Sequence, residues 1–382
     1  MKKFNAMAVG IIAMTGLCFI PAQLFAAQTP GDATVVASGL LGPRGLAFGP
    51  DRALYIAEAG AGGTNATTPS QCMQVPVPIG PYTGGPTARI SKVDANGNLS
   101  TVAWGFPSTI SGGGTIGVAD VAFLNGTLYA LIGGGGCSHG NPLSSNGIAQ
   151  VDTRTGNWKL IADLGIAYLG THPAKYESAD DFEPDGTYYG MIASHGRLIT
   201  VEPNHGNLVA VSPRGKIDTL LDISASQGHI VPTSLAELDG ALYVGNLNLF
   251  PIDPQWARVQ VIRPSNSEGE NLAPGFESRG DNHVRYAIVD SKAGFTTVVS
   301  VRFGPDGLLY VLELSDAPGF PTPGAGKVVR VKHSGEIEEV ITGLTVPTAM
   351  TFGADGSLYV SNLGAAPAGA GQILKFAIAP GW

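Results

Sequence analysis

One phrase recurs along the chain and limits what the chain can fold into. It reads LGPRGLAFGPDRALYIAEAG at Leu41–Gly60, VVSVRFGPDGLLYVLELS at Val298–Ser315 and VPTAMTFGADGSLYVSNLG at Val346–Gly364. In each copy an alternating apolar stretch stops at a Gly-Pro-Asp or Gly-Ala-Asp turn and resumes around Leu-Tyr. Proline presets φ at the second turn position, and the following glycine, replaced by Arg52 in the first copy, accepts a positive φ. Each phrase therefore predicts a β-hairpin.

A second phrase follows the hairpin and adds two more strands. After the first hairpin, Ala88–Asp94 and Leu99–Ala103 flank a Gly-Asn turn. After the hairpin that begins at Val298, Gly326–Val331 and Glu336–Ile341 flank a Ser-Gly turn. The repeated unit is therefore predicted to contain four antiparallel strands.

Six copies of the core of the second strand mark six units. From first to last their spacing averages about 61 residues, longer than the roughly 40–50 residues of common propeller repeats. We attribute the difference to inserted loops at Gly60–Thr87, Gly133–Asn146 and Gly165–Gly190. The copies are Leu54-Tyr55, Leu128-Tyr129, the worn copy Leu198-Ile199, Leu242-Tyr243, Leu309-Tyr310 and Leu358-Tyr359.

The two ends of the chain indicate how the repeat closes. The last unit has only three strands, ending at Gln372–Ala377, whereas Thr34–Leu40 precedes the first unit without a hairpin of its own. Thr34–Leu40 resembles Glu339–Leu344, the fourth strand of the fifth unit. Four-stranded units cannot bury both faces alone, so they close into a ring. We predict an all-β, six-bladed β-propeller over residues 28–382, with the last blade closed by the N-terminal strand.

The composition agrees with an all-β chain and limits its partners. The chain has 54 Gly, 27 Pro and only 14% charged residues, which favours short strands joined by tight turns. Its formal net charge is −8, and Lys and Arg do not cluster. Nucleic acid and anionic membrane surfaces require such clusters, so the sequence argues against both as partners.

The N-terminus has the order of a secretory signal peptide. Lys2 and Lys3 precede an apolar run at Ala6–Ile20, and the small residues Ala26 and Ala27 follow. The alternative is a membrane anchor, but the run is shorter than the roughly 20 apolar residues that cross a bilayer. We expect cleavage of residues 1–27 and a secreted or periplasmic product. The chain ends at Trp382 without the pattern of a sorting anchor, so we expect no membrane anchor.

Two cysteines remain after this cleavage, Cys72 and Cys137. Disulfides form and persist in exported proteins, so a Cys72–Cys137 disulfide is predicted. The alternative is a pair of buried, unpaired thiols.

Polar residues recur where the second strand of each unit ends. The position three residues after the repeated tyrosine holds a carboxylate or an amide in five of the six units. We expect these side chains around the mouth of the central channel, where their oxygens would suit Ca²⁺, Mg²⁺ or Mn²⁺. The alternative is that they satisfy backbone groups at the strand ends. The residues are Glu58, Glu202, Asn246, Glu313 and Asn362.

Other motifs give weaker signals. His139 and His205 stand in Gly-rich loops without ligand spacing, so solvated imidazoles are expected. Gly112–Gly117 matches a dinucleotide fingerprint, but no helix pattern follows it. Asp181–Gly186 begins like a calcium loop, but Ile192 stands where such a loop needs a glutamate. The acidic run Glu177–Asp185 is therefore expected to be a solvated loop.

The units together carry a family resemblance. GLAFGPDRALYIAEAG, DVAFLNGTLYALIGGGG, VEPNHGNLVAV, VPTSLAELDGALYVGNLNLFP and FGPDGLLYVLE stand in units one to five. Over about Thr34–Phe376 the chain resembles the ScyD/ScyE family of secreted β-propellers, named for scytonemin pigment gene clusters. The resemblance implies export and the propeller fold, but no established reaction. The chain departs most from the family at Lys175–Gly190, which is unusually acidic.

Two functions remain open from the sequence. The first is a non-catalytic exported propeller that binds a small molecule, a polymer or a protein at its channel mouth. The second is a metal-dependent lactonase or hydrolase of the gluconolactonase or regucalcin type, which would use the predicted ring of oxygen ligands. No recognised nucleophile motif decides between them.

Overall fold

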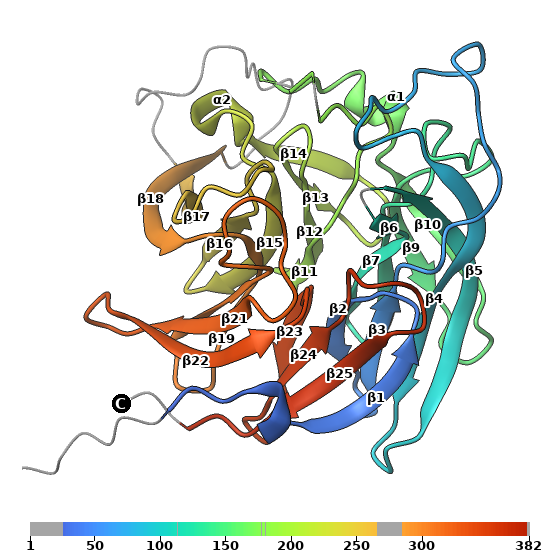
Figure 1. Cartoon of the computed structure of the whole chain (residues 1–382). Helices are drawn as coiled ribbons and strands as arrows, with labels where there is room; N and C mark the ends of the chain where they lie inside the picture. Colours follow the sequence, from blue (N-terminus) through green and yellow to red (C-terminus); the bar gives the residue numbers. More distant parts are fainter. Residues whose placement is uncertain (1–25, 113, 177, 180, 266–284, 380–382) are drawn as a thin grey trace, which may run out of the picture.

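The computed structural model describes residues 26–112, 114–176, 178–179, 181–265 and 285–379. Six antiparallel sheets surround a common centre (Figure 1), and each sheet is one blade. The predicted all-β, six-bladed β-propeller is confirmed. Three short helical turns lie outside the sheets: η1 (Pro30–Asp32), α1 (Ile166–Leu169) and α2 (Ser224–Gln227).

Blades 1 to 3 follow one another along the chain. Blade 1 contains β2 (Pro43–Phe48), β3 (Leu54–Glu58), β4 (Thr83–Val93), β5 (Leu99–Ser111) and β6 (Gly114–Ile116). Blade 2 contains β7 (Val118–Leu124), β8 (Thr127–Ile132), β9 (Gly147–Val151) and β10 (Trp158–Asp163). Blade 3 contains β11 (Met191–Ser194), β12 (Arg197–Glu202), β13 (Asn207–Val211) and β14 (Ile217–Asp222).

Blades 4 to 6 complete the ring. Blade 4 contains β15 (Pro232–Leu238), β16 (Ala241–Asn246), β17 (Ala257–Ser265) and β18 (Arg285–Phe295). Blade 5 contains β19 (Val298–Phe303), β20 (Leu309–Glu313), β21 (Gly326–Val331) and β22 (Ile337–Leu344). Blade 6 contains β23 (Ala349–Phe352), β24 (Leu358–Asn362), β25 (Gly371–Phe376) and β1 (Thr34–Leu40).

The N-terminal strand closes the last blade, as the sequence predicts. β1 pairs antiparallel with β25, from Thr34 opposite Lys375 to Leu40 opposite Gly371. In Figure 1 the blue N-terminal strand lies beside the red C-terminal strand. Closure joins the two ends of the described chain in one sheet, so it leaves no unpaired blade at the seam.

In the repeated phrase, the aspartate of the turn accepts a hydrogen bond from the tyrosine of the following strand. The hydroxyl of Tyr55 donates to Asp51 (3.0 Å), and that of Tyr310 donates to Asp306 (2.9 Å). The first glycine of the turn leaves room for the ring, because a Cβ on Gly49 would lie 2.6 Å from the ring of Tyr55. The Gly-x-Asp turn and the Leu-Tyr strand therefore recur together as one structural unit.

The same tyrosine also connects neighbouring blades. Its ring makes an edge-to-face contact with the phenylalanine on the first strand of the next blade in four of the six interfaces. Such contacts stabilise a pair by about 0.5–1.5 kcal/mol beyond area burial. The pairs are Tyr55–Phe123, Tyr243–Phe303, Tyr310–Phe352 and Tyr359–Phe48.

Two inserted loops are joined covalently. Cys72 and Cys137 form a disulfide with a Cα–Cα distance of 6.2 Å, so the predicted bond is confirmed. It joins the loop after β3 in blade 1 to the loop after β8 in blade 2.

The predicted signal peptide falls almost wholly outside the described part of the chain, which begins at residue 26. Among the described residues, no helix is long and apolar enough to span a bilayer.

Candidate functional site in the central channel

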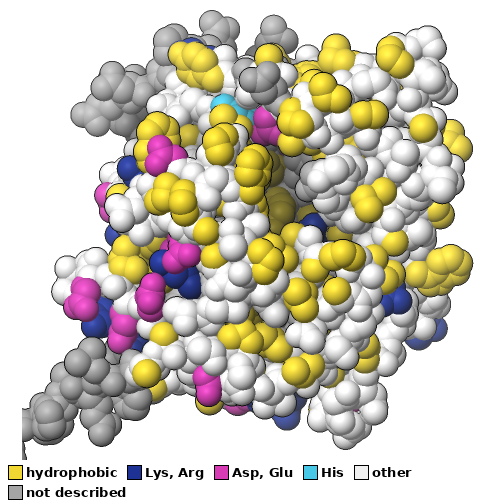
Figure 2. Space-filling view, viewed as in Figure 1, with side chains coloured by type: hydrophobic (Ala, Val, Ile, Leu, Met, Phe, Trp, Pro, Cys, Tyr) yellow, Lys and Arg dark blue, Asp and Glu magenta, His cyan; other side chains and the backbone are white. Residues whose placement is uncertain are grey.

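The first strands of the blades border a hollow on the propeller axis. Residues from all six blades line it, and its enclosed volume is about 10 Å³, within about 250 Å³ of empty space that includes open solvent. A cavity needs roughly 10–15 Å³ of such enclosed volume to hold one water molecule. Figure 2 shows an opening near the centre of one face, with basic surface at its edge. The enclosed part therefore suits about one water molecule, and a ligand would bind where the hollow opens to solvent.

One position of the repeat faces this hollow in all six blades. In blade 2 this residue is Asp120. It directly precedes Val121, which pairs with Ala130, and Ala130 is the residue after the repeated Tyr129. A register shift accompanies this position in four blades, and such bulges re-aim a side chain. The equivalent residues are Gly45, Asp120, Gly190, Ser234, Ser300 and Ala349.

Asp120 is the acidic member of this set, and it is 4% exposed. Its Oδ1 accepts the N–H of Val121 (2.8 Å), and its Oδ2 accepts the N–H of Met191 (2.9 Å) from the next blade. Burial raises the pKa of Asp120 to about 6, against the opposing effects of Arg302 and these N–H groups. A buried carboxyl group that changes charge near neutral pH is typical of functional sites.

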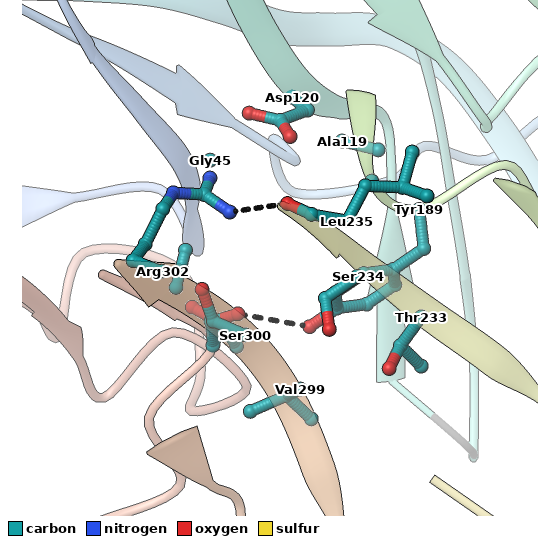
Figure 3. A pocket seen from close by; sticks show the side chains of 13 residues that line it. Gly45, Ala119, Asp120, Tyr189, Thr233, Ser234, Leu235, Val299, Ser300 and Arg302 are labelled. Atoms are coloured by element: carbon teal, nitrogen blue, oxygen red, sulfur yellow. Dashed lines mark hydrogen bonds between the residues drawn. The ribbon is translucent and has the colours of Figure 1, made fainter. Parts of the chain in front are cut away.

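Arg302 reaches the hollow from β19 in blade 5, on the opposite side of the ring from Asp120 in blade 2 (Figure 3). Its Nη1 donates to the carbonyl oxygens of Leu235 (2.9 Å) and Val301 (2.8 Å). Burial lowers the pKa of Arg302, and the charge of Asp120 opposes that shift. The two described side chains attract each other without forming a direct ion pair.

Uncharged hydroxyl groups complete the polar wall. Ser234 is 3% exposed, and its Oγ has no hydrogen-bond partner among the described residues. Tyr189 donates to the carbonyl oxygen of Thr348 (3.3 Å) and also bonds to Arg44. A buried hydroxyl group without a partner costs free energy. Ser234 therefore marks a place where a ligand group or an ordered water would bond.

The five residues of the predicted ring lie at the ends of second strands, and none lines the hollow. Their placement around the channel mouth therefore stays a prediction. Asn246 accepts the N–H of Arg258 (2.9 Å), and the other four accept a backbone N–H at the entry to their own blade. These donor and acceptor residues are Leu41 and Glu58 (2.6 Å), Thr187 and Glu202 (2.9 Å), Thr296 and Glu313 (2.8 Å), and Thr345 and Asn362 (2.9 Å).

These bonds fit the alternative that the five side chains satisfy backbone groups. Glu58 has further partners, because Arg89 donates through Nε (2.8 Å) and Nη2 (2.9 Å) and Ser91 donates through its hydroxyl group. In the described ranges, no three His, Cys, Asp or Glu residues form a group that could hold a metal ion. A Ca²⁺ or other divalent-cation site at the ring stays a prediction that this arrangement does not favour.

His139 and His205 were expected to be solvated, and that expectation is wrong. They are 0% and 3% exposed. His139 lies between the carbonyl oxygen of Gly135 (2.7 Å) and Oε2 of Glu183 (2.9 Å). His205 bonds through Nδ1 to Glu202 (2.9 Å).

The acidic loop is also less solvated than expected. Glu183 and Asp185 are 2% and 4% exposed. Tyr82 donates to Glu183 (3.0 Å), and Ser138 donates to Asp185 through both its N–H (2.8 Å) and its hydroxyl group (2.6 Å). These carboxylates join three inserted loops, because buried acidic groups must find donors.

No protein-family model and no curated protein matches the chain. Solved structures share its fold. One is a putative oxidoreductase (glucose dehydrogenase) from Thermus thermophilus, 18% identical, with a TM-score of 0.55 over 90% of this chain and 99% of that chain. Another is the calcium-binding protein regucalcin from Agrobacterium tumefaciens, 14% identical, with a TM-score of 0.52 over 93% and 96%.

A third similar structure is the PQQ-bound aldose sugar dehydrogenase from Streptomyces coelicolor. It is 15% identical, with a TM-score of 0.50 over 91% of this chain and 97% of that chain. At such identities the similarity extends to the fold alone, because one propeller fold hosts unrelated functions.

The residues of the hollow were missed from the sequence, although one signal was present. Asp120 interrupts the apolar run Val118–Phe123 at a position where the other units carry Gly, Ser or Ala. A charged residue inside an apolar strand indicates either a buried partner or a site. Arg302 carries a weaker signal, because it stands in an alternating strand where a solvent-facing side chain is equally expected.

Proposed function

We propose that this protein is an exported binding propeller, related to the ScyD/ScyE family, that binds a small polar ligand where the hollow of its central channel opens to solvent. The observation that carries the proposal is the pair Asp120 and Arg302, which face the same hollow from opposite blades without a direct ion pair. Asp120 is buried and Arg302 is half-buried, and a buried charge is costly unless it is paired or bound to a ligand. A polar ligand between them would offset that cost.

The rest of the wall supports the same proposal. The hydroxyl group of Ser234 lacks a partner among the described residues, and it lies on the same hollow. The equivalent positions in three other blades are occupied by Gly45, Gly190 and Ala349. These residues add little bulk to the wall, and Gly45 leaves the room that the side chain of Asp120 occupies. Few polar groups in a confined space are typical of small-ligand sites.

Export is supported by the confirmed disulfide. A Cys72–Cys137 bond persists in an oxidising compartment and is rare in a reducing cytosol. The mass of the protein recovered from the native periplasm or medium tests this part of the proposal. A product beginning near residue 28 supports export, and a full-length product confined to the cytosol contradicts it.

The binding proposal is tested by blocking the hollow. The melting temperature of the mature protein is measured with a panel of neutral polyols, amides, amines and carboxylates. Ser234→Leu fills the hollow, and Ser334→Leu makes the same change on the exposed turn between β21 and β22. A compound that raises the melting temperature of the native protein and of Ser334→Leu, but not of a folded Ser234→Leu variant, supports the proposal.

Two outcomes would contradict it. The first is a panel in which no compound stabilises the native protein. The second is stabilisation that is unchanged in a folded Ser234→Leu variant, since the ligand would then bind elsewhere.

A further inference from the structure

The charge around the hollow depends on the protonation of Asp120. Arg302 lines the hollow from blade 5, and Asp120 lines it from blade 2. Among the described residues that line it, these two charges balance while Asp120 is ionised, and one positive charge remains when Asp120 is protonated. A ligand with one negative charge would then make the site neutral, and in a low-dielectric interior this balance is worth more than at the surface.

The hydrogen bonds of Arg302 leave a donor edge available. Nη1 serves the carbonyl oxygens of Leu235 and Val301. Within the described ranges, neither Nε nor Nη2 of Arg302 forms a hydrogen bond, and the side chain keeps partial solvent exposure. These two nitrogens form the edge of a guanidinium group that binds a carboxylate through two parallel hydrogen bonds.

We infer that the open side of the hollow takes a small monocarboxylate, or the single carboxylate end group of a longer ligand, bound to the Nε and Nη2 edge of Arg302. This inference rests on the proposed function and names the ligand class of the same site. The unpartnered hydroxyl group of Ser234, a residue that is 3% exposed, is a second donor on the same wall. A dianion would leave an excess negative charge, and a cation would add to the positive excess.

Asp120 makes carboxylate binding depend on pH. The ionisable groups that act on it or that it acts on are Arg302 from β19 and Tyr189 from the segment before β11. A bound carboxylate adds a negative charge near Asp120 and so raises the pKa of Asp120 above its value of about 6. Protonated Asp120 also stops repelling the ligand. Binding should therefore tighten as pH falls from 7.5 to 5.5, with uptake of a proton.

The test uses the full mature protein and matched pairs of probes. Acetate is compared with acetamide, propionate with propionamide, and glycolate with glycolamide, by titration calorimetry at pH 5.5 and 7.5. We expect each carboxylate to bind about tenfold or more tightly than its amide. A tenfold difference in affinity corresponds to about 1.4 kcal/mol. The carboxylate affinity should rise by about tenfold on acidification if Asp120 takes up the proton.

Variants assign the effect to residues. Arg302→Gln should remove the preference for carboxylates, whereas Arg154→Gln, at a side chain that is 87% exposed, should leave it unchanged. Asp120→Asn should keep carboxylate binding and remove its pH dependence. If Arg302→Gln does not fold, the comparison of acid and amide in the native protein still decides the ligand class.

The possible failures are distinguishable. Amides that bind as well as the acids, and that lose binding when Ser234→Leu fills the hollow, would overturn the carboxylate inference and keep the proposed function. Carboxylate binding that weakens on acidification would also overturn the inference. If no probe binds the native protein and the wider panel also fails, the proposed function falls with it.

Discussion

Gly45 and Asp120 share one space from neighbouring blades. A Cβ built on Gly45 would lie 1.7 Å from Oδ1 of Asp120 and 2.7 Å from its Cα. Position 45 can therefore hold only glycine while Asp120 keeps its place against the N–H of Val121. The glycine in blade 1 therefore makes room for the carboxylate in blade 2.

Gly45→Ala is expected to displace Asp120 and to destabilise the fold by roughly 1–3 kcal/mol, as overpacking of a filled interior does. Chemical denaturation measures the change in the free energy of unfolding. Gly112→Ala is the matched control, because a Cβ there meets nothing within 4 Å. Equal stability of the two variants would mean that Asp120 does not hold the position described.

Glu58→Gln is expected to lower the free energy of unfolding by about 2 kcal/mol, since hydrogen bonds to a charged group are worth about 1.5–3 kcal/mol. The new amide group can accept through one oxygen only, while Leu41, Arg89 and Ser91 all donate to Glu58. Glu336→Gln, at a side chain that is 64% exposed, is the control.

The same variant tests the predicted metal ring. If the ring is structural, a chelator should leave the melting temperature of the native protein unchanged, and the loss in Glu58→Gln should be the same with and without Ca²⁺. A stoichiometric divalent cation that is lost in Glu58→Gln or Glu313→Gln would instead restore the ring as a metal site.

Replacing Cys72 and Cys137 by serine is expected to destabilise the protein by about 2–4 kcal/mol, because the bond closes a loop between residues 65 positions apart. Thermal unfolding with and without a reductant measures the effect. The reductant should destabilise the native protein and have no effect on the double variant. A native protein insensitive to full reduction would show that other contacts hold these loops.

The buried pair His139 and Glu183 should make stability fall as pH rises. Burial lowers the pKa of His139, but the charge and hydrogen bond of Glu183 outweigh it and raise that pKa; burial raises the pKa of Glu183. The folded state therefore binds protons more tightly than the unfolded chain. The contribution of His139 is full below pH 6.5, the ordinary value for histidine, and is lost as pH passes the raised pKa of His139. The contribution of Glu183 is full below pH 4.5, the ordinary value for glutamate, and is lost as pH passes the raised pKa of Glu183.

The free energy of unfolding between pH 6 and 9 measures this dependence. Replacing both His139 and Glu183 by glutamine should flatten the profile in this range, apart from the contribution of Asp120. His333→Gln, at an exposed position, should leave the profile unchanged. A profile as steep in the double variant as in the native protein would assign the dependence to other groups.

The sequence determined the fold because its signals are local and repeated. The Gly-x-Asp turn and the Leu-Tyr strand form hairpins within a few residues, and the blade count follows from their recurrence. The match between Thr34–Leu40 and Glu339–Leu344 was enough to predict closure by β1. The N-terminus indicates an exported protein. In an oxidising compartment, the two remaining cysteines, Cys72 and Cys137, are expected to form a disulfide.

Only the tertiary structure decided which side chains face the axis. A strand alternates its faces with a period of two, so a bulge before Asp120, Ser234 or Ser300 changes which residue points inward. Counting from the repeated tyrosine identified the residues at the strand ends. Their side-chain oxygens already accept hydrogen bonds from backbone N–H groups. Asp120 and Arg302 lie far apart in the sequence. They line the same hollow because closure of six blades sets blades 2 and 5 opposite each other.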